Sequence, residues 1–251
     1  MTTEINTLDQ KFHTLTDKYK LVKTSDLIDK LQAQGFKLDK FVANRVRNKA
    51  KIGYQKHRAI FSHPELLKST GDGNPQLLLT NSHDGTSAVV LQLGFFRMVC
   101  ANGLVIGKSI GEPIRLRHSG KFIYDELDKA VEKIVAQVKT MNEAIDKLKA
   151  KVLSEGEIAS FQKQALDLRM ASNVEVLDSK FNVNRPEDAK PDLFTVFNVI
   201  QENLVRGGAR VIVKELATSQ VKQKTLRKIT SIQAETEINT KLWDMAMALA
   251  A

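Results

Sequence analysis

The chain has 251 residues, of which 42% are hydrophobic and 27% charged, and its 38 Lys and Arg residues against 29 Asp and Glu residues give a net charge of +9. A chain of this length buries enough apolar surface to fold without disulfide bonds, and its single cysteine, Cys100, excludes an internal one. No apolar run approaches the roughly 20 residues of a membrane span, and residues 1–10 are too polar for a signal peptide. We therefore expect a cytoplasmic protein that does not interact with a membrane.

The positive charge is concentrated in two tracts. Residues 37–58 contain eight basic residues and one acidic residue, and residues 206–228 contain seven basic residues and one acidic residue. These tracts carry net charges of +7 and +6, so the rest of the chain sums to −4. Apolar residues are interleaved with the charges, which favours folded surfaces over disordered tails. We expect both tracts to face an anionic partner; two solvated basic faces without a ligand are the alternative.

The N-terminal part of the chain, residues 1–35, is expected to be a helical segment. Thr24, Ser25 and Asp26 are suitable cap residues, and Gly35 is a suitable stop.

Residues 36–118 predict an antiparallel β-meander, because apolar and polar residues alternate and turn residues separate the runs. The expected strands or strand fragments lie at residues 52–54, 59–61, 77–80, 88–96, 104–106 and 114–117. The expected turns lie at residues 69–75, 83–85 and 101–103.

Beyond residue 120 the spacing of apolar residues lengthens to that of a helix. The heptad seam consists of Leu127, Val131, Ile134, Val138, Met141, Ile145, Leu148 and Val152. It predicts a helix about 39 Å long, at 1.5 Å per residue, that packs within the chain or against another copy. A capping-box pattern at Ser154 and Glu157 predicts the next helix. Further helices are expected at residues 192–204, before Gly207 and Gly208, and at residues 239–250.

These elements predict an α+β fold: a central antiparallel β-meander packed against a long heptad-patterned helix, with a helical C-terminal region. The expected organisation is an N-terminal helical segment at residues 1–35, a core domain at residues 36–172 and a helical, basic C-terminal region at residues 173–251.

Motifs for catalysis are weak. Four of the five histidines, His57, His63, His83 and His118, fall in the predicted meander, but none of their spacings places two on one helix face as metal ligands. No phosphate-binding loop, dinucleotide fingerprint or nucleophile elbow is present. We therefore expect no enzymatic activity, no metal site and no cofactor. A metal-dependent nuclease remains an alternative.

The basic tracts favour binding of nucleic acid. Single strands are held by cationic grooves that contact phosphates and by aromatic faces on which bases stack. Tyr54 lies within the first tract, and Arg115 and Arg117 alternate along one predicted strand, which places them on a common face. The candidate nucleic-acid-binding residues are Lys40, Arg45, Arg47, Lys49, Lys51, Tyr54, Lys56, Arg58, Arg97, Arg115, Arg117, His118, Lys121, Arg206, Arg210, Lys224, Arg227 and Lys228.

Four short motifs carry a resemblance to a known family. They are N-S-H-D-G at residues 81–85, R-x-V-C-x-N-G-L at residues 97–104, R-H-S-G at residues 117–120 and F-N-V-I-Q-E-N at residues 197–203. With them the chain resembles a family of phage- and plasmid-borne proteins known as domain of unknown function 932. The likeness covers roughly residues 36–247.

Members of that family often lie beside genes of DNA recombination and replication. The resemblance therefore implies a protein similar to the phage Red-beta recombinases, which anneal single strands and assemble into rings or filaments. Our hypothesis is a homo-oligomeric, sequence-independent single-stranded DNA-binding and annealing protein of a phage or plasmid. It would act without ATP in recombination or replication, in the cytoplasm of the host cell. The alternatives are an interaction protein that blocks host defence by binding a host or phage protein, and the nuclease.

Overall fold

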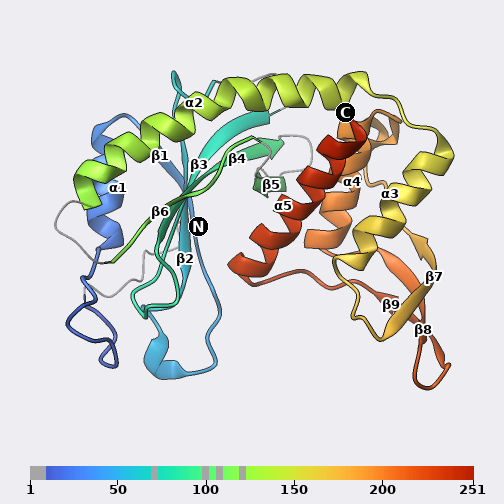
Figure 1. Ribbon diagram of the computed structural model, residues 1–251, viewed down its shortest axis with the longest axis horizontal. Helices are drawn as coiled ribbons and strands as arrows, with labels where there is room; N and C mark the ends of the chain where they lie inside the picture. Colours follow the sequence, from blue (N-terminus) through green and yellow to red (C-terminus); the bar gives the residue numbers. More distant parts are fainter. Residues whose placement is uncertain (1–9, 69–72, 98–101, 106–109, 119–122) are drawn as a thin grey trace. The chain divides into compact units, whose positions relative to one another are not determined.

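The computed structural model describes residues 10–68, 73–97, 102–105, 110–118 and 123–251. The chain forms two compact units (Figure 1). Unit 1 comprises Met1–Met141 and Thr230–Ile232, and unit 2 comprises Asn142–Ile229 and Gln233–Ala251. The order of helices and strands confirms the predicted α+β class.

Unit 1 is built on a six-stranded sheet. Its strands are β1 (Lys37–Ala43), β2 (His57–Ser62), β3 (Gly73–Asn81), β4 (Val89–Arg97), β5 (Asn102–Val105) and β6 (Ile114–Leu116). Strands β1 to β5 pair antiparallel in chain order, and β6 pairs with β4. The predicted antiparallel meander is therefore confirmed.

One face of this sheet forms the core of unit 1. Ala59, Leu79 and Leu91 lie opposite one another on adjacent strands and are fully buried. Alternate residues of a strand point to the same face, so Phe61 and Phe95, which are also fully buried, belong to this core.

Two helices accompany the sheet in unit 1. Helix α1 (Thr24–Ala33) buries Leu27 and Leu31, and helix α2 (Ile123–Ala150) begins in this unit (Figure 1). Lys30 of α1 forms an ion pair of 3.0 Å with Asp128 of α2.

Helix α2 confirms the predicted heptad helix. The seam residues Leu127, Ile134, Met141 and Leu148 are fully buried within the single chain. The helix ends at Ala150, so Val152, which continues the seam in the sequence, lies outside the helix and is 64% exposed.

A short return of the chain completes unit 1. Residues 230–232 belong to this unit, although the segments on either side of them belong to unit 2. The backbone N–H of Ile232 donates to Asn44 Oδ1 at 2.9 Å, which ties the return to the loop that follows β1.

Unit 2 contains the other predicted helices. Helix α3 (Glu155–Asp167) starts with the expected capping box of Ser154 and Glu157, and α4 (Leu193–Val205) is capped by Asp192, whose Oδ1 accepts from Thr195 N at 2.9 Å. Helix α5 (Ile232–Leu249) closes the chain.

Unit 2 also contains a three-stranded antiparallel sheet that we did not expect. It consists of β7 (Val174–Lys180), β8 (Arg210–Glu215) and β9 (Val221–Thr225) in the order β7-β8-β9. Val211 and Val213 of the central strand are buried, whereas every residue of β9 is exposed. Short strands rich in charged residues give a weak apolar alternation, which explains why the sequence pattern missed them.

Four local predictions are wrong. Gly73, Asn74 and Pro75, which we expected in a turn, belong to β3 and pair with β4, and the rest of that expected turn, residues 69–72, lies outside the described residues. Residues 10–23 form turns, not helix, because backbone bonds such as Phe12 N to His83 O at 3.0 Å and Lys20 N to His118 O at 2.6 Å tie them to the sheet. Residues 52–54 form a turn, not a strand. Asn102 and Gly103 belong to β5 and pair with β4, so they are not a turn.

Candidate nucleic-acid interface

Residues 44–56, here called the basic loop, connect β1 to β2 and contain most of the first basic tract. Arg45, Arg47 and Lys49 are exposed, and none of the three forms an ion pair with a described residue. Lys51 is half-buried. The loop therefore presents three uncompensated cations to solvent.

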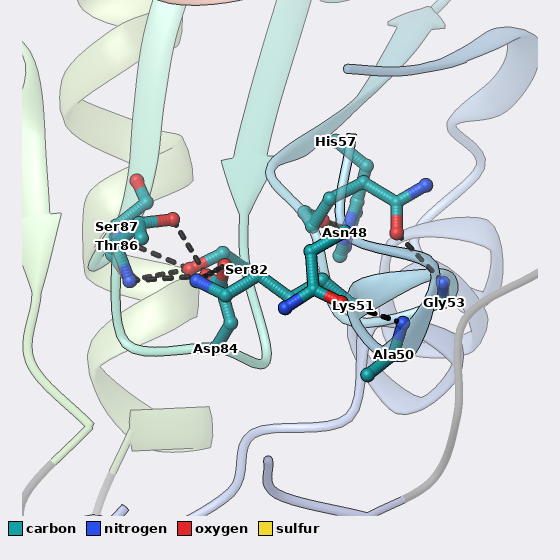
Figure 2. A network of polar contacts seen from close by, with 10 residues as sticks. Asn48, Ala50, Lys51, Gly53, His57, Ser82, Asp84, Thr86 and Ser87 are labelled. Atoms are coloured by element: carbon teal, nitrogen blue, oxygen red, sulfur yellow. Dashed lines mark hydrogen bonds and ion pairs between the residues drawn. The ribbon is translucent and has the colours of Figure 1, made fainter. Parts of the chain in front are cut away.

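The conformation of the basic loop is fixed by local hydrogen bonds (Figure 2). The Asn48 side chain accepts from Ala50 N at 3.0 Å and caps a single 3₁₀ turn, Lys49–Lys51. Gly53 has a φ of +89° and donates its N–H to Gln55 Oε1 at 2.6 Å. Asn and Gly suit these positions because an Asn side chain caps a turn and Gly tolerates positive φ.

An ion pair holds the basic loop against the turn at residues 82–87. Lys51 Nζ lies 3.2 Å from Asp84 Oδ2, and the Asp84 side chain is only 4% exposed (Figure 2). Asp84 Oδ1 also accepts from Thr86 N at 3.2 Å and from Thr86 Oγ1 at 2.6 Å. Burial alone would raise the pKa of Asp84, but the bonds from Thr86 and Lys51 bring it below its usual value. The carboxylate therefore stays charged at neutral pH.

His83 joins three segments beneath the basic loop. Its backbone N–H donates to Tyr54 O at 2.8 Å, and its carbonyl accepts from Phe12 N at 3.0 Å. Its ring Nε2 lies 3.2 Å from Thr24 Oγ1 of α1, and the residue is completely buried. His83, which the sequence assigned to an ordinary turn, thus fixes the end of the loop.

The hydroxyl of Thr24 is the centre of a buried polar network. It lies 2.7 Å from His57 Nε2 and accepts from Asn81 Nδ2 at 3.0 Å. His57 Nδ1 contacts Gln55 O at 2.8 Å, so Nδ1 carries the proton and Nε2 accepts from the Thr24 hydroxyl. His83 Nε2–H then donates to Thr24. Burial lowers the pKa of His57 to about 4, which keeps this ring neutral at pH 7.

The sheet face opposite the core carries two further candidate cations, Arg58 of the first tract and Arg115, which lies outside both tracts. Arg58 of β2 lies directly opposite Thr80 of β3, with Nε donating to Thr80 Oγ1 at 3.2 Å. Arg115 of β6 lies in the same row, three strands from Arg58. Arg58 is 5% exposed, whereas Arg115 is exposed. Burial lowers the pKa of Lys56, and the charges of Arg115 and Arg58 lower it further while Asp84 opposes them. Lys56, the last residue of the basic loop, therefore lies in the positive field of Arg115 and Arg58. The side chain of Arg58 is buried, so it does not belong to an open surface as we expected.

The other candidates in unit 1 divide by exposure. Lys40 and Arg117 are exposed. Arg97 and His118 are 7% and 8% exposed, so their buried side chains do not belong to an open surface as we expected. Lys121 lies outside the described residues.

His118 is buried because it holds the N-terminal segment. Its ring stacks on Tyr19 with a centroid separation of 4.6 Å, and its Nδ1 donates to Lys20 O at 3.2 Å. Tyr19 in turn donates its hydroxyl to Ser82 O at 3.0 Å. Burial lowers the pKa of His118. These contacts give it a structural role.

The second basic tract lies in unit 2, where all five candidates are exposed: Arg206, Arg210, Lys224, Arg227 and Lys228. The tract runs from the end of α4 through β8 and β9. The two basic tracts are thus carried by different units, each with its own sheet.

Sequence reasoning missed the residues that position the basic loop, above all Thr24, Asn81 and Asp84. The N-S-H-D-G motif at residues 81–85 was the available signal, because five polar or turn residues follow the apolar run Leu77–Leu79. Its asparagine and histidine are completely buried, which is unusual for a turn and marks a polar network.

The described residues contain no group of three or more His, Cys, Asp and Glu side chains that could hold a metal ion. Across the same residues, no helix is both long enough and apolar enough to cross a membrane.

Comparison with known proteins places the chain in a family. The family described as Domain of unknown function (DUF932) matches residues 11–243, so the match also includes the N-terminal segment. UPF0380 protein YafZ of Escherichia coli (strain K12) is 31% identical over 243 residues, 96% of this chain and 86% of the relative. UPF0380 protein YfjQ of the same strain is 30% identical over 245 residues, with the same coverage of 96% and 86%. No solved structure matches the chain. The chain belongs to the DUF932 family, as its motifs predicted.

Proposed function

We propose that this protein binds single-stranded DNA through backbone phosphates, without sequence preference, and promotes annealing of complementary strands as a homo-oligomer. The observation that carries the proposal is the basic loop, which presents the uncompensated cations Arg45, Arg47 and Lys49 from a fixed conformation. A fixed loop loses little conformational entropy when it binds, so its charges contribute more to affinity than those of a flexible tail.

The loop also offers apolar contact surface for bases. Ile52 is 49% exposed, and Tyr54 is half-buried with its ring 5.2 Å from that of Phe12. Unpaired bases expose faces that such side chains can cover, whereas bases in a duplex do not. This favours single strands over double-stranded DNA.

Annealing requires no ATP, because pairing of complementary strands is downhill once their phosphates are neutralised. The family resemblance supports a role in phage or plasmid recombination or replication in the cytoplasm of the host cell. Assembly into a ring or filament would place many basic loops along one strand and increase the total affinity.

Titration of a labelled 30-nucleotide single strand at several salt concentrations tests the proposal. Neutralisation of about six phosphates gives a slope of log affinity against log salt near −4. Arg45→Ala with Arg47→Ala and Lys49→Ala is expected to weaken binding of every sequence alike, to reduce this slope by about 2, and to slow annealing of two complementary labelled strands.

The matched control removes three exposed lysines from α2: Lys129→Ala with Lys133→Ala and Lys147→Ala. It lowers the net charge equally, so it is expected to change the slope far less. Equal effects of the two triple variants, or no binding at low salt, would refute the proposal. A host protein recovered without nucleic acid after nuclease treatment would instead support the interaction protein, and degradation of the strand with magnesium would support the nuclease.

A further inference from the structure

Unit 2 brings two cations into direct cross-strand register. Lys180 of β7 lies opposite Arg210 of β8, and Arg210 lies opposite Thr225 of β9. Directly opposed residues of an antiparallel sheet point to the same face, with Cβ atoms about 5 Å apart. All three residues are exposed. Lys180 was not among the residues predicted from the sequence.

The backbone places two more cations beside this row. Gly207 has a φ of +86°, and a Cβ there would lie 2.5 Å from Leu226 O. The backbone at Gly207 therefore lies too close to the backbone at Leu226 for any residue with a side chain. Gly208 N donates to Leu226 O at 3.0 Å. Arg227 and Lys228, both exposed, directly follow Leu226. We call Lys180, Arg210, Thr225, Arg227 and Lys228 the cationic corner.

The charges of the cationic corner are uncompensated. None of its four cations forms an ion pair with a described residue. Arg185 in the same unit shows the contrast, because its Nη1 and Nη2 bind the two oxygens of Glu202 at 2.8 and 3.0 Å. Like charges directly opposite in a sheet destabilise it. The direct opposition of Lys180 and Arg210 is therefore unfavourable, and an anion bound between them would relieve it.

A competing explanation for these cations is that they stabilise the C-terminus of α4, which carries the negative end of the helix dipole. That interaction is short-ranged and falls off within the last turn of a helix. Arg169 already supplies it, because its Nη1 donates to Leu204 O in the last turn of α4, and its Nη2 donates to Arg227 O at 2.9 Å. Lys180 and Arg210 lie on strands, so this explanation does not account for their register.

We propose that the cationic corner is a phosphate-binding site that takes backbone phosphates of a nucleic-acid strand, separately from the basic loop. The chemistry fits, since an Arg fork binds two phosphate oxygens, a Lys adds a point charge and a Thr hydroxyl donates a further hydrogen bond. This inference rests on the proposed function and adds a second point of attachment to it.

The other end of the same sheet provides a matched control. Lys214 of β8 lies opposite Glu175 of β7, and Lys222 of β9 forms an ion pair of 2.7 Å with Glu215. Lys180→Thr with Arg210→Thr and Lys214→Thr with Lys222→Thr therefore each remove two positive charges from one sheet. In the first variant the two cations lie opposite each other; in the second, Lys222 has an ion pair with Glu215 and Lys214 lies directly opposite an acidic residue. Threonine suits both because it favours strands.

Binding of the 30-nucleotide strand is measured for both double variants. Lys180→Thr with Arg210→Thr is expected to weaken binding at least tenfold at low salt and to reduce the salt slope by about 1.4, the value for two phosphates. Its melting temperature is expected to stay the same or rise, because the opposed charges are gone. The control is expected to bind within threefold of the wild type and to melt slightly earlier.

The outcomes separate the inference from the function on which it rests. Equal weakening by the two double variants, or none by either, overturns the cationic corner as a site while the basic loop variant still tests the proposed function. Absence of oligonucleotide binding by the wild type overturns both. A lower melting temperature of Lys180→Thr with Arg210→Thr would show that the pair stabilises the fold and would also count against the site.

Discussion

The basic loop of unit 1 and the cationic corner of unit 2 hold uncompensated charges by different means. The basic loop is anchored by side chains, through the Lys51–Asp84 ion pair and the buried network around Thr24. The cationic corner is held by backbone, through strand register and the close approach at Gly207. We infer that protonation or substitution of the anchoring side chains disrupts the basic loop. The cationic corner is disrupted only by substitutions that force its backbone to move.

The largest effect is expected from Gly207→Ala. A Cβ at this position meets the backbone of Leu226 and the positive φ adds strain, so unit 2 should lose about 3 kcal/mol or more. Urea unfolding followed by the fluorescence of Trp243, the single tryptophan and fully buried in unit 2, measures the loss. Gly156→Ala in α3 is the control, because nothing lies within 4 Å of its Cβ. Similar urea midpoints for Gly207→Ala and Gly156→Ala would contradict the conclusion that the close backbone approach at Gly207 holds the cationic corner.

Lowering the pH is expected to destabilise unit 1. His57 has a pKa lowered by burial to about 4, against 6.5 when unfolded, so the unfolded state binds more protons between these values. The neutral His57 ring therefore adds about 3 kcal/mol to the free energy of unfolding above pH 6.5, and this stabilisation is lost as the pH falls from 6.5 to 4. Amide hydrogen exchange of β2 and β3, with the ring titration of His57 by NMR, checks this. A ring that titrates near 6.5 would refute it.

Thr24→Val tests the network without changing the shape of the side chain. The substitution leaves polar atoms of His57, His83 and Asn81 without their partner in a buried site, which should cost unit 1 about 2 kcal/mol. Thermal unfolding compares it with Thr24→Ser, which keeps the hydroxyl and should lose less. If the valine variant is as stable as the serine variant, the hydroxyl does not anchor the loop.

Asp84→Asn gives the smallest change in stability, about 1 kcal/mol, because the bonds from Thr86 can persist. Its effect on binding is more informative. The variant gains one positive charge, so charge alone predicts tighter binding of single strands, whereas loss of the Lys51 anchor predicts binding about threefold weaker. We expect the weaker binding. Tighter binding in the oligonucleotide titration would show that anchoring of the loop does not matter.

Elements with regular local patterns could be predicted from the sequence. The meander, the heptad helix and the capping box of α3 each depend on residues a few positions apart. The buried network could not be predicted, because Thr24 meets His57 and Asn81 across 33 and 57 positions. No periodicity marks such pairs.

The cationic corner could not be predicted from the sequence for the same reason. Lys180 and Arg210 are ordinary surface residues in the sequence, and only strand register makes them neighbours. The candidate list from the sequence therefore contained Arg210 but not Lys180. It also contained the buried residues Arg58, Arg97 and His118, because burial of a basic residue is decided by tertiary packing that composition does not show.

The return of residues 230–232 to unit 1 determines how the chain can be divided. Because Ile232 N donates to Asn44, the first residue of the basic loop, no single break in the chain separates one complete unit from the other. A fragment that stops at Met141 lacks part of unit 1, and a fragment that starts after it carries that part away. Unit 1 is therefore complete only when the chain continues through most of unit 2, so a truncation before residue 230 is expected to remove a contact from unit 1 as well.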